Sequence, residues 1–77
     1  MTHEIRFIRR FDAMSDSGNH YVVREYQNFE INFTGGGTFQ EMGGLKTWNT
    51  TTGLLVNKTD NPKVFKIIST NETIRET

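Results

Sequence analysis

The chain has 77 residues, with nine basic and nine acidic side chains, two histidines and no cysteine. A chain of this length forms one domain, residues 1–77, and buries only about 60% of the surface that it exposes when unfolded. Disulfides and thiolate metal sites are excluded, and the histidines are too few for a histidine-rich metal site, so we expect no metal and no cofactor. The balanced charge argues against a nucleic acid or an anionic membrane as a mainly electrostatic partner.

Self-association is the remaining source of extra stability. Small domains usually add disulfides, a metal ion or a partner chain, and the composition excludes the first two. We therefore expect a homo-oligomer, most simply a dimer, or a complex with another protein. Residues 1–10 contain no unbroken apolar run of the signal-peptide kind, and no segment approaches the roughly 20 apolar residues that span a bilayer. The chain is expected to be cytoplasmic, without a membrane partner.

The first half of the chain predicts two strands joined by a turn. Residues 3–12 alternate apolar and charged side chains and are rich in β-branched and aromatic residues, which favours a strand over the helix that the spacing also allows. Residues 13–19 (AMSDSGN) are typical of a turn. Residues 20–34 predict a long strand whose alternation changes phase at residues 26–28, which indicates a bulge or a bend.

These two strands are expected to form a hairpin. A register that sets Phe11 opposite Val23 also sets Arg9 opposite Glu25. It further sets Ile5 opposite Phe29. Each pair is favourable between neighbouring strands, because it joins two apolar groups or two opposite charges.

The second half predicts short strands between tight turns. Three glycines, residues 35–37, break the chain, and Thr38 with Glu41 forms a capping-box pattern that predicts one short helical turn near residues 38–42. Gly43 and Gly44 are expected to end that turn. The later pattern predicts strands at 45–48, 54–58 and 63–69, turns at 49–53 and 59–62, and a tail that forms a short edge strand at 73–75 or frays.

The predicted fold is all-β, with about five antiparallel strands in a meander. Several strands carry apolar residues on both faces. An open sheet would expose one of these faces, so we expect a small half-open barrel or a twisted sheet that dimerises.

The sequence contains no recognised catalytic motif. The glycine run followed by Gly44-Leu45-Lys46-Thr47 departs from a phosphate-binding loop, because Leu45 separates the glycine from the lysine and a strand follows. Neither histidine lies at a recognised ligand spacing, and no serine lies in a nucleophile elbow. We expect a protein that is not an enzyme.

Nine aromatic residues are many for so short a chain. We assign most of the rings to the core, namely Phe7, Phe11, Phe29, Phe33 and Phe65. Trp48 is expected to be partly exposed, as in interface anchors. The predicted interaction surface consists of Trp48, Tyr26, Arg24, Lys46 and Arg10. The leading hypothesis is a self-associating binding module, and the alternative is a small barrel that binds single-stranded nucleic acid by stacking bases on aromatic rings.

Two segments carry a resemblance to known proteins. Residues 21–27 (YVVREYQ) and 44–67 (GLKTWNTTTGLLVNKTDNPKVFKI) are similar to a group of short bacterial all-β proteins. The resemblance implies a bacterial, stand-alone small protein. It implies no activity, cofactor or catalytic residue.

Overall fold

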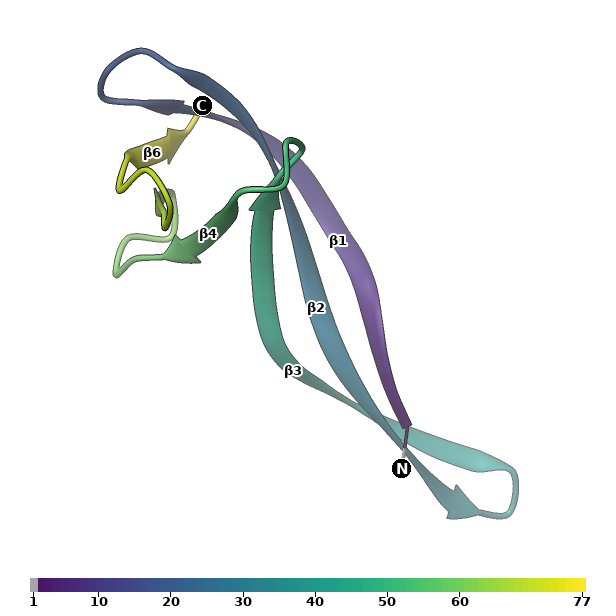
Figure 1. Cartoon of the computed structure of the whole chain (residues 1–77). Coiled ribbons are helices and arrows are strands. Elements are labelled where there is room, and N and C mark those ends of the chain that lie inside the picture. Colours follow the sequence, from purple (N-terminus) through teal and green to yellow (C-terminus); the bar gives the residue numbers. More distant parts are fainter. Residues whose placement is uncertain (1) are drawn as a thin grey trace.

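The computed structural model describes residues 2–77, which form six antiparallel strands and no helix. The strands are β1 (Thr2–Ser15), β2 (His20–Gly35), β3 (Thr38–Thr50), β4 (Leu55–Lys58), β5 (Val64–Ile67) and β6 (Thr73–Glu76). They pair in chain order, and β6 pairs with β1 at Ala13–Ser15, so the sheet closes into a barrel (Figure 1).

Two of the connecting loops have the same local structure. After β1, the backbone N–H of Gly18 donates to the Ser15 carbonyl, and Ser15 Oγ accepts from the Asn19 N–H at 3.0 Å. After β3, Gly53 donates to Thr50 and Thr50 Oγ1 accepts from the Leu54 N–H at 3.0 Å. Both glycines have φ near +90°, which other residues rarely adopt. The hydroxyls of Ser15 and Thr50 are therefore buried with partners.

The core lies inside the barrel and follows the two-residue period of its strands. Phe65 and Ile67 are buried while Lys66 between them is exposed, because successive side chains of a strand point to opposite faces. The Phe65 ring packs on Phe11 with centroids 5.1 Å apart. The buried core residues are Phe11, Ala13, Val23, Val56, Phe65, Ile67 and Ile74.

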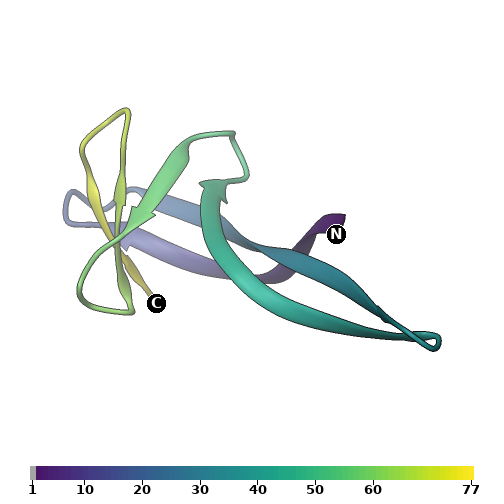
Figure 2. The same ribbon diagram turned by 90° about the horizontal axis from the view of Figure 1, so that it is seen from below.

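Strands β1, β2 and β3 are much longer than the barrel and leave it together as a curved ribbon (Figure 2). We call this ribbon the arm and define it as residues 2–8, 27–35 and 38–46. Its tip is the β2–β3 hairpin beyond the pairing of Thr2 with Ile31. The radius of gyration is 15.6 Å, whereas a compact domain of this length has about 11.5 Å. The arm accounts for this difference.

The all-β antiparallel prediction is confirmed, and the structure corrects its details. The barrel is closed rather than half-open and has six strands rather than about five, because the tail forms β6 between β5 and β1 instead of an edge strand. The predicted helical turn near residues 38–42 is wrong. These residues belong to β3, since cross-strand pairing with β2 outweighs the local capping-box pattern. Gly36 and Gly37, both with positive φ, make the two-residue hairpin turn instead.

The predicted hairpin register is correct near the barrel and wrong in the arm. Phe11 lies opposite Val23, and Arg9 lies opposite Glu25. Beyond them Ile8 is an extra residue of β1, so Ile5 lies opposite Asn28 and not Phe29. The β2–β3 ladder also shifts beside Asn28, between Gln27 and Phe29. The irregularity predicted at residues 26–28 is therefore present, but the extra residues belong to the strands on either side.

Candidate functional site

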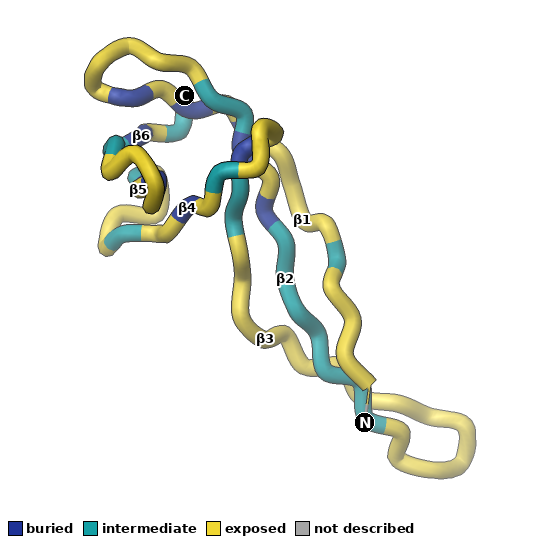
Figure 3. Tube along the Cα trace, viewed as in Figure 1, coloured by how far each residue is buried: buried dark blue, intermediate teal, exposed yellow. Residues whose placement is uncertain are grey.

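The arm presents a sheet face that continues the inner face of the barrel. The opposed pairs along β2 place Phe29, Ile31 and Phe33 on the same side as the buried Val23. Phe39 of β3 lies opposite Phe33, with ring centroids 6.3 Å apart. Inside the barrel this side is covered by β4, β5 and β6, whereas along the arm Phe29 and Ile31 are half-buried and Phe33 and Phe39 are exposed. The arm part of β2 is accordingly of intermediate burial except at the tip (Figure 3). We call it the inner face of the arm.

A small group of charges lies among these rings. The Arg6 guanidinium donates to Glu41 Oε1 at 2.6 Å and to Glu4 Oε2 at 2.8 Å, and it lies 4.5 Å from the centre of the Phe29 ring. The hydrogen bond from Arg6 lowers the pKa of Glu41. The group joins β1 to β3 across β2, so it holds the three strands of the arm together without adding a net positive charge.

The opposite, outer face of the arm is also partly apolar. Ile5 and Phe7 of β1 and Met42 of β3 lie on this face by register and are exposed. Phe7 contacts Tyr26 edge to face at 5.7 Å between centroids. Leu45, in the irregular part of β3, is 83% exposed. Large apolar side chains are thus uncovered on both sides of the arm.

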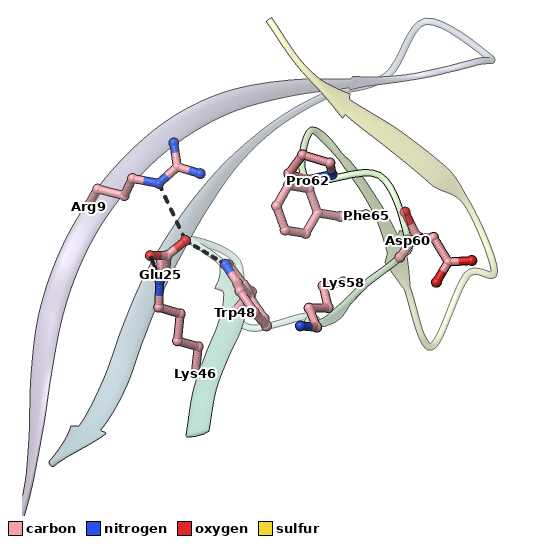
Figure 4. Close-up of a pocket in the computed structure, with 9 residues that line it drawn as sticks. Arg9, Glu25, Lys46, Trp48, Lys58, Asp60, Pro62 and Phe65 are labelled. Atoms are coloured by element: carbon pink, nitrogen blue, oxygen red, sulfur yellow. Dashed lines mark hydrogen bonds and ion pairs between the residues drawn. The ribbon is translucent and has the colours of Figure 1, made fainter. Parts of the chain in front are cut away.

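The root of the arm is the place where the arm joins the barrel, at Arg9, Glu25, Lys46 and Trp48. It is built around one buried carboxylate. Glu25 is 4% exposed, and its Oε1 accepts a hydrogen bond from Trp48 Nε1 at 2.8 Å and one from Arg9 Nε at 3.3 Å (Figure 4). Lys46 Nζ lies 3.5 Å from the other oxygen. Arg9 also donates to Glu76 at 2.7 Å, which connects the root to β6. The cluster therefore links β1, β2, β3 and β6 at the point where the arm leaves the barrel.

The charge state of Glu25 follows from two opposing effects. Burial by itself raises the pKa of this carboxyl group, because it penalises the charged form. The hydrogen bond from Trp48 and the charges of Lys46 and Arg9 outweigh burial, and the pKa is lowered overall. Glu25 is therefore ionised at neutral pH and acts as the acceptor around which the root is ordered.

Next to this cluster the end of the barrel has an open hollow of about 360 Å³. Trp48 and Phe65 provide its aromatic wall, with centroids 5.7 Å apart, and Lys58 and Asp60 lie on its rim (Figure 4). The charges lining it are of both signs. No group of three or more potential metal ligands exists among residues 2–77. The arrangement can hold side chains of a partner.

The five residues predicted as an interaction surface do not share one face. Trp48 and Lys46 lie together at the root, on the side of Glu25. Arg24 lies opposite Arg10, and with Tyr26 it occupies the other side of the sheet. Trp48 is half-buried, as expected for the ring beside the loop at 49–53.

The prediction of which rings form the core is partly wrong. Phe11 and Phe65 are buried, but Phe7 is 56% and Phe33 72% exposed, and Phe29 is half-buried. The reason is that the arm has no second layer among residues 2–77, so its apolar side chains are left without a covering element of the described chain. One signal in the sequence pointed to this. A strand of 15 residues is roughly 50 Å long, which exceeds what a barrel of so few residues can enclose.

Comparisons with protein-family models, with curated proteins and with solved structures give no match. The structure contains no helix in residues 2–77 that is long and apolar enough to cross a membrane. The resemblance to short bacterial proteins stays a prediction.

Proposed function

We propose that the chain is a non-catalytic interaction module that self-associates through its arm. The observation that carries this proposal is where the exposed apolar residues lie. Of the ten large hydrophobic side chains that are exposed among residues 2–77, seven belong to the arm, namely Ile5, Phe7, Ile8, Phe33, Phe39, Met42 and Leu45. Exposed apolar surface concentrated in one region marks an interaction site, whereas scattered residues do not.

The seven side chains are divided between the two faces of the arm. At roughly 100 Å² of exposed area for each, they expose about 700 Å² in all, against roughly 800 Å² buried per partner in a standard stable complex. The tip of the arm, where β2 and β3 pair beyond Thr2, also needs a partner for its own sake, since an isolated two-stranded hairpin is marginally stable in water and three or more strands are needed for independent stability. A second copy of the chain would add such strands. The cytoplasmic location stays a prediction from the sequence.

The small barrel is compatible with the alternative function as well, that of binding single-stranded nucleic acid. Such a site needs aromatic platforms beside cations on one continuous surface. Here Tyr26 and Arg24 lie on the opposite side of the sheet from Trp48 and Lys46. The cations at the root are engaged by Glu25, which reduces the positive potential available to phosphates. These placements favour the interaction module.

Molar mass in solution tests the proposal. Light scattering coupled to size exclusion should give a dimer or a larger assembly at micromolar concentration. Phe39→Ser, at the tip of the arm, should raise the dissociation constant at least about tenfold, since it removes roughly 1.5–3 kcal/mol of buried apolar surface. The matched control is Leu55→Ser on β4, where the side chain is exposed to a similar degree, 62% against 57% for Phe39.

Two results would refute the proposal. One is a monomer at concentrations up to about 1 mM, the limit of weak association. The other is an equal effect of the two substitutions, which would remove the arm from the interface. Salt-sensitive binding of single-stranded oligonucleotides that Trp48→Ala abolishes would support the alternative function instead.

A further inference from the structure

The arm has two open sheet edges, and they differ in how well they are protected. The β1 edge, from Thr2 to Arg10, lies free of β6, which pairs with β1 further along. It carries Glu4, Arg6, Arg9 and Arg10 and an extra residue at Ile8. Charged side chains and bulges are the devices by which proteins prevent an edge from pairing with another chain. The β1 edge is therefore blocked.

The β3 edge lacks these devices between Thr38 and Gly43. Residues 39–43 pair with β2 without interruption, and β4 pairs with β3 only further on, at Trp48 and Asn49, among residues 2–77. Within this stretch the one charged side chain is Glu41, which is held by Arg6. Its outward N–H and C=O groups are thus available for pairing with another strand.

We infer that residues 38–42 of β3 pair antiparallel with the same residues of a second copy, with Gln40 opposite Gln40 of that copy. This inference rests on the proposed self-association and names the surface that carries it. A two-fold axis perpendicular to the sheet makes the contact isologous, as in most dimers. It also joins the two arms into one continuous sheet, in which the inner face of one arm continues into the inner face of the other.

The register follows from the pleat and from charge. Residues directly opposite each other must lie on the same face, so Phe39 and Glu41 of the inner face cannot oppose Gln40 or Met42 of the outer face. An axis at Glu41 would set two carboxylates directly opposite, which is unfavourable. An axis at Phe39 would run into the turn at Gly36 and Gly37 after few pairs. The axis at Gln40 avoids both problems and sets Phe39 against Glu41, and Thr38 against Met42.

Cysteine cross-linking tests this geometry directly, because the chain contains no cysteine of its own. In the proposed dimer the Cβ atoms of two residues at position 40 are about 5 Å apart, close to the separation that a disulfide spans. Gln40→Cys should therefore form a disulfide-linked dimer under mild oxidation. The control is Asn32→Cys. Asn32 lies opposite Gln40 on the same face of β2, and its distance to its counterpart is three strand spacings, about 14 Å.

A second pair of variants measures the contact without oxidation. Gln40→Lys sets two ammonium groups against each other across the axis, and we expect the dissociation constant to rise at least about tenfold. Asn32→Lys adds the same charge on the same face one strand away, and we expect a change of less than about threefold. The barrel is untouched by either variant, so circular dichroism should show an unchanged fold.

The outcomes separate the inference from the proposed function. A dimer in which position 40 fails to cross-link, or in which both lysine variants have equal effects, would overturn the β3 pairing and leave self-association intact. A monomer at every concentration would overturn both. Preferential cross-linking and selective weakening at position 40 are the results that support the inference.

Discussion

The hydrogen bond between Trp48 and Glu25, opposed residues of β3 and β2, gives the sharpest test of what stabilises the sheet where the arm leaves the barrel. The indole N–H is 2.8 Å from a carboxylate oxygen of a side chain that is only 5% exposed. A hydrogen bond to a charged group contributes about 1.5–3 kcal/mol to stability. We therefore predict that Trp48→Phe, which keeps a ring on Phe65 but removes the donor, lowers the free energy of unfolding by about 2–3 kcal/mol, including some lost apolar contact.

A double-mutant cycle isolates this hydrogen bond. Glu25→Met has a similar volume and removes the acceptor, and the Arg9 and Lys46 side chains, 42% and 45% exposed, regain water. In the Glu25→Met background, Trp48→Phe removes an N–H that no longer has its acceptor. The loss in unfolding free energy caused by Trp48→Phe should then be smaller by at least about 1.5 kcal/mol, and this difference is the coupling energy of the pair.

The assay is urea unfolding followed by far-ultraviolet circular dichroism, because Trp48 is the only tryptophan and its fluorescence is lost in the variant. Protein concentrations below the dissociation constant of the dimer keep association out of the measured stability. If the costs of the two substitutions add to within about 0.5 kcal/mol, the bond does not fasten the root and the account of Glu25 is wrong.

Three further predictions concern the barrel and the tip of the arm. Ile74→Ala, in the strand that closes the barrel, should cost about 2–5 kcal/mol in urea unfolding because Ile74 is fully buried, whereas Leu55→Ala, at an exposed position, should stay within about 0.5 kcal/mol. Hydrogen bonds, first of all from Tyr21, lower the pKa of Glu72 from 4.5 to about 2. The folded state therefore binds this proton less readily than the unfolded state, so stability is lost as the pH falls from about 4.5 toward 2, and acid titrations of Glu72→Gln should lack that part of the slope. Gly36→Val forces a β-branched residue to a φ of +62° and should lower the stability of the turn by about 1–2 kcal/mol. Amide exchange in the hairpin should then be faster. Unchanged exchange would contradict the turn assignment.

Much of the strand pattern could be predicted from local sequence. Residues 20–34 were predictable as a strand because aromatic and β-branched residues alternate there, and the structure places β2 at His20–Gly35. The turns predicted at 13–19 and 49–53 from their turn-forming residues are present, but they begin only after Ser15 and Thr50, since residues 13–15 and 49–50 belong to strands. Both signals depend on neighbours a few residues apart, which is the range over which sequence patterns are informative.

The candidate site was only partly predictable. Trp48 and Lys46 were identified, but Glu25, around which they gather, was noticed only as the cross-strand partner of Arg9. A carboxylate in a strand looks like a surface residue until the structure shows that three donors converge on it. The helical turn near residues 38–42 failed for the same reason, because long pairing with β2 decided the conformation of residues with a strong local helix-start signal.

By itself, the amino-acid sequence determined an all-β chain without disulfides, with most of its turns and with more large apolar side chains than so small a core needs. Only the tertiary structure decided which of these side chains are covered. Phe65 is buried and Phe33 is exposed, although both lie in apolar, alternating strands. The difference arises because Phe11 and Trp48 pack on Phe65 inside the closed barrel, whereas no strand among residues 2–77 lies over Phe33. Burial is a property of contacts between distant segments, so no local pattern distinguishes a core ring from one that awaits a partner.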